Sequence, residues 1–338
     1  MKIEFFTKWT AIMLLAAALL TGCTIEDESD CIGDMALTFR FTHDGHDNFG
    51  PEVPEVPSLS VFVFDENGIF VGRWDETDNS KFGTNYTMKL PLPPGTYSFI
   101  VWGGLSDEQY YLCNPDNNQD NAKEPVVGKT HIDDILLRLT GSHSNEVAFI
   151  PATQFHGEAM KQEVVAGQSK DIVIDLVKNS KEIRLTILGL PLPASRMAIA
   201  KADPFTQMNM WLTAPNGGYN FHNIMEQGAT LMTYLEQGRD NNTGNSLIGS
   251  FHTLQLKLKD KNYNNIPYIY TLWNNQTGSV HHTADLLHDY IHKAQAYNTQ
   301  AKIDAEDLFD ITIELDPYVG VTVTVNGWKV DTSGSIIQ

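Results

Sequence analysis

The sequence predicts a mainly β protein that contains two β-sandwich domains and one short helix in its C-terminal half. Alternation of apolar and polar residues with a period of two is far more common in the 338-residue chain than helical spacing. Turn-forming clusters separate these segments, and a polar break at residues 178–181 divides them into two groups. We therefore place one sandwich over 36–179 and a second over 180–330, followed by a tail at 331–338.

The first 22 residues have the layout of a bacterial lipoprotein signal peptide. Lys2 and Lys8 give a basic start, an apolar run follows over residues 9–20, and small residues lead directly into Cys23. A helix of about 12 residues spans about 18 Å, which is too short for the ~30 Å hydrocarbon core of a membrane. We expect Cys23 to begin the mature protein and to carry the acyl chains that tether it to a membrane. An ordinary secretory signal with a chance cysteine is the alternative.

The chain continues into a predicted acidic tether over residues 23–35. Thr24–Asp30 is mostly polar or acidic and cannot build a core, so one interpretation is a flexible spacer. An acidic stretch directly after a lipidated cysteine also resembles the surface-export signal of Bacteroidetes lipoproteins. That resemblance predicts a place on the outer face of the outer membrane.

Two cysteines remain once Cys23 carries lipid. Cys31 and Cys113 form an even pair in an oxidising compartment. A disulfide between them fits this context, and two free buried thiols fit it equally. Neither cysteine has the spacing of a zinc site.

In the N-terminal half, the patterns predict strands and a first hairpin. Alternation over residues 37–41 is typical of a strand with one buried face. Residues 59–64 are apolar on both faces, which indicates a central strand or one covered by a loop. The Asn-Gly turn within 65–68 separates this segment from 69–71 and predicts a tight hairpin, because such a turn needs positive φ angles.

A second hairpin is predicted around the Pro-rich turn at residues 91–95. This turn separates two β-like segments, 86–90 and 97–102. Short helical turns are expected within 122–137.

In the C-terminal half, alternation predicts strands at 183–187, 254–258 and 309–315. One helix is expected over His282–Gln295, where four apolar residues form a stripe at helical spacing. The residues of this stripe are Leu287, Tyr290, Ile291 and Ala294.

The charge balance excludes polyanionic partners. The chain has 42 acidic and 23 basic side chains and a net charge of −19. Such a surface repels nucleic acid, so we expect no nucleic-acid partner.

The sequence contains no catalytic motif. A phosphate-binding loop, a zinc-protease helix signature and a Gly-x-Ser-x-Gly elbow are all absent, so we expect no catalytic residue and no cofactor. Three polar groups are candidate metal sites, but solvated turns or an exposed helix face explain each of them better. They are His43, Asp44, His46 and Asp47; residues 114–121; and His288 and His292 with His281 or His282. We therefore predict no metal site.

Three tryptophans leave a second interpretation open. Trp211, Trp273 and Trp328 can stack on sugars if they are exposed, whereas aromatic residues of a β-sandwich more often belong to its core.

The order of several short motifs resembles the FimB/Mfa2 family of fimbrial anchor lipoproteins of Bacteroidales. The resemblance spans nearly the whole mature chain, although each motif alone is unspecific. Its segments after the lipid signal and acidic tether are Asp30-Cys31, 63–68, 92–97, 101–104, 176–184 and 321–328.

The resemblance implies two transthyretin-like β-sandwich domains and a non-catalytic protein that holds a fimbrial shaft to the outer membrane and influences fibre length. The implied partner is a shaft subunit, a fimbrillin, bound by strand complementation. Residues 309–315 and 320–326 are candidate elements of that interface, and two ordinary edge strands are the alternative. Shaft subunits of the family are cleaved after an arginine. Here Arg40 lies inside a strand, which favours retention of the N-terminus.

Two other functions share the lipid signal and the predicted architecture. One is a surface glycan-binding lipoprotein, and the other is an adhesive tip subunit of the same fimbriae. A lipid-anchored hydrolase is the third alternative. It ranks last because it would require paired carboxylates in one cleft, which the spacing of the residues does not reveal.

Overall fold

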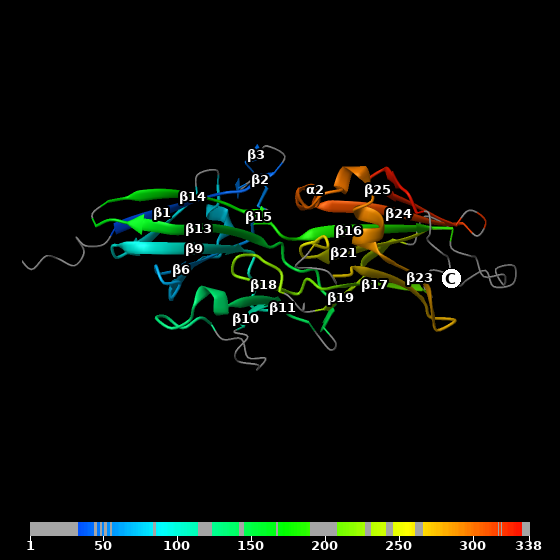
Figure 1. Cartoon of the computed structure of the whole chain (residues 1–338), viewed down its shortest axis with the longest axis horizontal. Helices are drawn as coiled ribbons and strands as arrows, with labels where there is room; N and C mark the ends of the chain where they lie inside the picture. The colour runs from blue at the N-terminus through cyan, green and yellow to red at the C-terminus, as the bar shows by residue number, and fades with distance from the viewer. Residues whose placement is uncertain are drawn as a thin grey trace, which may run out of the picture.

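The structure is a computed structural model that places most of the chain in five main β-sheets. It describes residues 33–43, 46–47, 49–50, 53–54, 56–83, 86–113, 124–141, 145–166, 168–189, 208–226, 231–240, 246–260, 266–316, 318 and 320–332. The molecule is elongated, with two β-sandwiches side by side along its long axis (Figure 1). The mainly β fold class is thereby confirmed.

Sheets I and II form the N-terminal sandwich. Sheet I has the strand order β14-β1-β8, and sheet II has the order β15-β13-β9-β6-β7. β1 runs parallel to β14 and antiparallel to β8. The bounds are β1 (Gly33–Arg40), β6 (Leu59–Phe64), β7 (Phe70–Glu76), β8 (Thr87–Leu92), β9 (Gly95–Gly103), β13 (Phe155–Val164), β14 (Lys170–Asp175) and β15 (Val177–Lys178). Apolar side chains from both sheets fill the space between them.

β6 is buried on both faces, as its sequence predicts. Leu59, Val61 and Val63 face the core shared with sheet I. Phe62 and Phe64 face the opposite way, where the Phe62 ring packs edge-on against the Phe221 ring at 4.9 Å. Sheet II is therefore the middle layer of the N-terminal half.

Sheets IV and V form the C-terminal sandwich. Sheet IV has the order β12-β19-β17-β22-β23, and sheet V has the order β20-β21-β16-β24-β25-β26. The strands of sheet IV are β12 (Glu146–Val147), β17 (Met208–Ala214), β19 (Met232–Leu235), β22 (Ile269–Asn274) and β23 (Ser279–Asp285). Those of sheet V are β16 (Lys181–Leu188), β20 (Gln237–Asp240), β21 (Leu247–Thr253), β24 (Leu308–Asp316), β25 (Gly320–Val325) and β26 (Trp328–Val330).

Sheet III joins the two halves of the chain. It consists of β10 (Tyr110–Cys113), β11 (Leu136–Leu139) and β18 (Gly218–Asn220), and β11 pairs with β18 across the two halves. β12 likewise pairs in parallel with β19. The polar break at 178–181 coincides with the change from sheet II to sheet V, while a continuous apolar core runs from sheet II into the C-terminal sandwich.

Two pairs of very short strands follow β1. β2 (Thr42–His43) pairs with β3 (His46–Asp47), and β4 (Phe49–Gly50) pairs with β5 (Val53–Pro54).

The predicted helix over 282–295 is only partly correct. His282–Asp285 belongs to β23, and helical structure begins with the π-helix η7 (Leu286–Ile291), whose first turn is capped by the Asp285 carboxylate. The four residues of the predicted stripe are all buried, so the apolar face was identified correctly. The short helices η8 (Gln295–Tyr297) and α2 (Gln300–Asp304) follow. In the N-terminal half, η2 (Asn79–Lys81) precedes β8, and η3 (Ile132–Asp134) lies within the segment where helical turns were expected.

The first predicted hairpin is confirmed, and the second is wrong. β6 and β7 form the first, with Gly68 at φ 77° in its turn. β8 and β9 do not pair, because they lie in sheets I and II. β9 is buried along almost its whole length, which suits the middle layer. In β8, exposed and less exposed side chains alternate, which suits a sheet with one solvent-exposed face. The Pro-rich turn therefore passes from one sheet to the other.

The predicted strand at 254–258 is also wrong. Its backbone groups are satisfied by side chains instead of a neighbouring strand. The N–H of Lys257 donates to the Tyr268 hydroxyl at 2.8 Å. The Gln300 amide accepts from the Leu258 N–H and donates to the Leu256 carbonyl, both at 2.8 Å.

Candidate functional site

The cysteines singled out by the sequence are only partly described. Cys23 and Cys31 lie outside the described residues. Cys113 ends β10, is half-buried and is a free thiol within the described part of the chain. Burial raises the pKa of Cys113, which keeps the thiol protonated and weakly nucleophilic. The lipid on Cys23 and the disulfide between Cys31 and Cys113 stay predictions.

β1 is built into the N-terminal sandwich. It is hydrogen-bonded on both sides, and Met35, Leu37 and Phe39 are fully buried against sheet II. At its end, the Arg40 Nε donates to Asp175 Oδ1 of β14 at 2.6 Å. The sandwich is therefore closed by β1, a strand of its own chain.

The C-terminal strands differ in what they offer a partner. β24 lies between β16 and β25, so it has no free edge for a partner strand, and the alternative of an ordinary edge strand is wrong for it. β25 pairs with β26 only from Val323 onward, and β26 is one of the two edges of sheet V, opposite β20. Asn326 and Gly327 have φ angles of 46° and 81°, which is the geometry of a two-residue hairpin of type I′. In this hairpin Val325 and Trp328, the pair nearest the turn, exchange hydrogen bonds. The next pair, Thr324 and Lys329, does not, so the Lys329 N–H points away from β25 toward the open edge.

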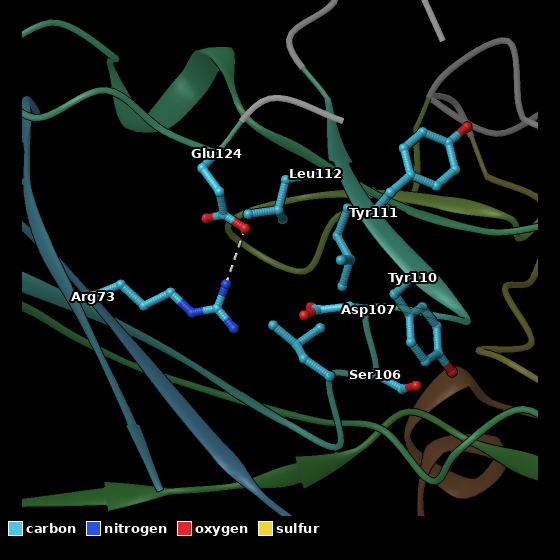
Figure 2. Close-up of a pocket in the computed structure, with 9 residues that line it drawn as sticks. Arg73, Ser106, Asp107, Tyr110, Tyr111, Leu112 and Glu124 are labelled. Atoms are coloured by element: carbon cyan, nitrogen blue, oxygen red, sulfur yellow. Dashed lines mark hydrogen bonds and ion pairs between the residues drawn. The ribbon is translucent and has the colours of Figure 1, made fainter. Parts of the chain in front are cut away.

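A small pocket opens between β7 and β10, with Arg73 extending into it (Figure 2). It encloses about 120 Å³. The Arg73 guanidinium donates to Asp75 at 2.8 Å, to Glu124 at 3.2 Å and to Ser60 at 3.3 Å. Its cation also lies 5.2 Å from the centre of the Phe62 ring. Sequence reasoning missed this pocket, because its residues come from segments without a shared motif.

The electrostatics of the pocket hold Arg73 in its charged form. Burial alone lowers the pKa of Arg73, but the hydrogen bond and charge of Asp75, together with Glu124 and Asp107, raise it overall. The Arg73 hydrogen bonds tie β7 to β6 through Ser60 and to the segment after β10 through Glu124. We see no pairing of a nucleophile with a base among the lining residues, which are Arg73, Leu105, Ser106, Asp107, Tyr110, Tyr111, Leu112, Glu124 and Leu137.

The candidate histidine ligands His288 and His282 have different surroundings. The His288 Nδ1 lies 2.9 Å from Asp285 Oδ2, and the His288 Nε2 accepts from the Lys259 N–H at 3.3 Å. His282 points into the core, and burial lowers its pKa to about 4. Within the described residues, no three His, Cys, Asp or Glu side chains come together to hold a metal ion. Of the first candidate loop, only the backbone of β2 and β3 is described.

The tryptophans occupy two different surfaces. Trp211 and Trp273 are half-buried neighbours on the outer face of sheet IV, with ring centroids 6.2 Å apart. Trp328 lies on β26 at the edge of sheet V and is 50% exposed. None of the three rings belongs to the buried core, so the core interpretation is wrong for them and sugar stacking stays a prediction.

A polar network fixes the junction of the two sandwiches. Asn179, which is fully buried, exchanges two hydrogen bonds with Asn223 at 2.8 and 3.0 Å, and it accepts a third from Gln255 at 3.1 Å. Lys181 is 3% exposed and donates to the carbonyl oxygens of Asp304 and Glu306, each at 2.7 Å. The polar residues at 178–181 were interpreted only as a boundary, so their structural role was missed.

No described helix is long and apolar enough to cross a membrane.

Comparison with known proteins identifies relatives of this chain. The model of the family described as "Fimbrillin-A associated anchor proteins Mfa1 and Mfa2" matches residues 27–334. The major fimbrium anchoring subunit FimB of Porphyromonas gingivalis is 26% identical over 188 residues, which cover 53% of this chain and 55% of FimB. The chain thus matches about half the length of that relative.

Solved structures share the fold. The fimbrial anchor protein Mfa2 from Porphyromonas gingivalis has a TM-score of 0.69 at 19% identity, covering 89% of this chain and 99% of Mfa2. A putative adhesin from Bacteroides ovatus also has a TM-score of 0.69 at 19% identity, covering 88% of this chain and 95% of the adhesin.

Proposed function

Because this chain belongs to the family of fimbrillin-A associated anchor proteins, we propose that it is a non-catalytic anchor that holds a fimbrial shaft at the outer membrane. The observation that carries this proposal is the family match over residues 27–334, which includes both sandwiches. The anchor attaches through acyl chains on Cys23, and the acidic tether places the sandwiches on the outer face of the membrane. In holding the base of the fibre, it also limits fibre length.

Closure of the N-terminal sandwich supports a position at the base of the fibre. In strand complementation, a subunit receives a strand from its neighbour in a groove that lacks one of its own strands. β1 fills this place with Met35, Leu37 and Phe39, and Arg40 pairs with Asp175. A subunit that keeps β1 accepts no donor strand there, so a fibre cannot continue past it in that direction.

The open edge of sheet V supports a contact with the first shaft subunit. β26 contains only three residues, and the Lys329 N–H is directed toward the open side. A strand from the partner can add to this edge through main-chain hydrogen bonds. We therefore place strand complementation at β26 instead of at β24.

Co-purification tests the function, and an edge variant tests the contact. The tagged chain is isolated from detergent-solubilised outer membranes after mild cross-linking, and we expect a fimbrial shaft subunit to co-purify with it. Lys329→Pro removes the outward N–H and leaves the β25–β26 pairing intact, so we expect it to lose the shaft subunit. Lys329→Ala keeps the N–H and is the matched control.

Two outcomes separate the two levels of the proposal. If the unmodified chain retains no shaft subunit, the anchoring function is wrong. If Lys329→Pro and Lys329→Ala retain it equally, the contact at β26 is wrong and the anchoring function stands.

A further inference from the structure

We propose that the outer face of sheet IV binds a neutral carbohydrate chain through Trp211 and Trp273. The register places both rings on one face: Asn209 pairs with Trp273, and Trp211 pairs with Thr271, so the two tryptophans are diagonal neighbours. Met208, Met210 and Leu212, which alternate with them on β17, are buried in the core. The tryptophans therefore face outward.

The two rings form one aromatic surface. Their centroids are 6.2 Å apart and their planes are inclined by 42°. Each ring is half-buried, so part of each remains accessible to solvent. Leu235 lies opposite Trp211, and Val280, 41% exposed, lies opposite Trp273. These side chains extend the surface along the strands.

Neutral polar groups surround the aromatic surface. The Asn209 amide donates to the Asn275 side chain at 3.3 Å, which leaves further amide donors and acceptors on both residues. Thr283 is exposed, and its hydroxyl donates to the Tyr270 carbonyl at 2.8 Å, so its oxygen can still accept; Thr271, opposite it on β22, is only 8% exposed. Sugars present hydroxyl groups to such partners and apolar C–H faces to aromatic rings.

Charge selects the class of carbohydrate. The chain has a net charge of −19. By contrast, the two cross-strand rows that contain the tryptophans consist of Leu235, Trp211, Thr271 and Thr283, and of Asn209, Trp273 and Val280. No ionisable side chain belongs to either row. His281, at the bulge beside Trp273, has its pKa lowered by burial and is neutral near pH 7. An uncharged hexose polymer fits this face, whereas a polymer of uronic acids has no cation to bind and is repelled by the chain.

Binding to a panel of soluble polysaccharides tests this site. The purified chain is titrated with mannan, galactan, dextran and laminarin as neutral probes, and with polygalacturonate as the acidic probe. We expect saturable binding to at least one neutral polymer and none to polygalacturonate. Trp211→Ala and Trp273→Ala should each weaken binding by about tenfold or more, the loss typical of removing a central aromatic contact. Trp211→Phe keeps an aromatic ring and should lose less.

Trp328→Ala is the matched control, because it removes a half-exposed tryptophan from a different sheet. It should bind as the unmodified chain does. The outer-face variants should also unfold at nearly the unmodified temperature, since their side chains lie outside the core.

Any of three results would overturn this site: no neutral polymer binds saturably, Trp328→Ala loses as much affinity as Trp211→Ala, or polygalacturonate binds as tightly as the neutral probes. Self-association of the chain that Trp211→Ala abolishes, without any sugar binding, would assign this face to a second copy of the protein instead. None of these results bears on the anchoring function, which is tested separately by co-purification.

Discussion

His156 shows how a single side chain couples the junction of the sandwiches to pH. It is 6% exposed, its ring packs against Trp102 with centroids 4.7 Å apart, and its Nε2 lies 2.9 Å from the Phe221 carbonyl oxygen. Burial lowers the pKa of His156 from 6.5 to about 4. Neighbours distant in sequence, and not the local pattern around His156, set this pKa.

The free energy of unfolding should therefore fall as the pH drops from about 6.5 to about 4. In this window the unfolded chain binds a proton that the folded chain excludes, and His156 accounts for roughly 3 kcal/mol at most. In His156→Gln the amide can still donate to Phe221 but does not titrate, so urea denaturation should show a shallower pH dependence for this variant. Equal pH dependence in the two proteins would show that His156 is not buried in its neutral form.

At Gly104 the backbone passes close to the backbone of Thr153. Gly104 has a φ of 75°, and a Cβ placed there would lie 1.9 Å from the Thr153 carbonyl oxygen. We expect Gly104→Ala to lower the free energy of unfolding by about 3 kcal/mol or more, because strain and a backbone clash add. Gly128 has nearly the same φ of 72° with nothing within 4 Å, so Gly128→Ala should cost only about 1–2 kcal/mol. Denaturant titration of both variants measures the difference, and equal losses would contradict the contact.

At the scale of elements, β1 closes the N-terminal sandwich. Phe39 is fully buried in the core, whereas the neighbouring Thr38 points outward and bonds Thr87 at 3.2 Å. Phe39→Ala should lower the free energy of unfolding by about 3–5 kcal/mol, and Thr38→Ala should lower it by less than about 1 kcal/mol. Chemical denaturation compares the two. Similar small losses would indicate that β1 is not an integral strand of the fold.

Local pattern predicted the strands better than their partners. Alternation identified β1, β16 and β24, and the apolar run at 59–64 identified a covered strand. The same alternation at 254–258 gave no strand, because the amide of Gln300 and the hydroxyl of Tyr268 occupy its backbone groups. Similarly, the turn before β9 leads to another sheet. Pairing depends on contacts distant in sequence, which a local pattern does not contain.

The surfaces were predicted less completely than the fold. Trp211 and Trp273 are recognisable as candidates, but only the pairing of β17 with β22 brings them to one face. The Arg73 pocket combines β7 with the loop before β10 and residue Glu124, so the sequence of no single segment predicts it. Likewise, β26 became the edge of sheet V because of the Asn-Gly hairpin before it, and not because of its hydrophobicity.

At the scale of the whole molecule, the two sandwiches should unfold together. One apolar core continues from sheet II into sheets IV and V, and strand pairs and the Asn179–Asn223 amides cross the junction. We expect a single thermal transition of residues 33–332, with the same midpoint by tryptophan fluorescence and by far-UV circular dichroism. Two separated midpoints would mean that the junction is too weak to couple the sandwiches.

The central claim is that this chain attaches a fimbrial shaft to the outer membrane through lipid on Cys23. The most direct measurement is the fraction of shaft protein that stays on cells compared with the fraction released into the medium. With Cys23→Ala, we predict that most fibres appear in the medium, while Ser29→Ala, which alters only the tether, keeps them on the cells. Fibres that stay on cells equally with both variants would contradict anchoring by this lipid.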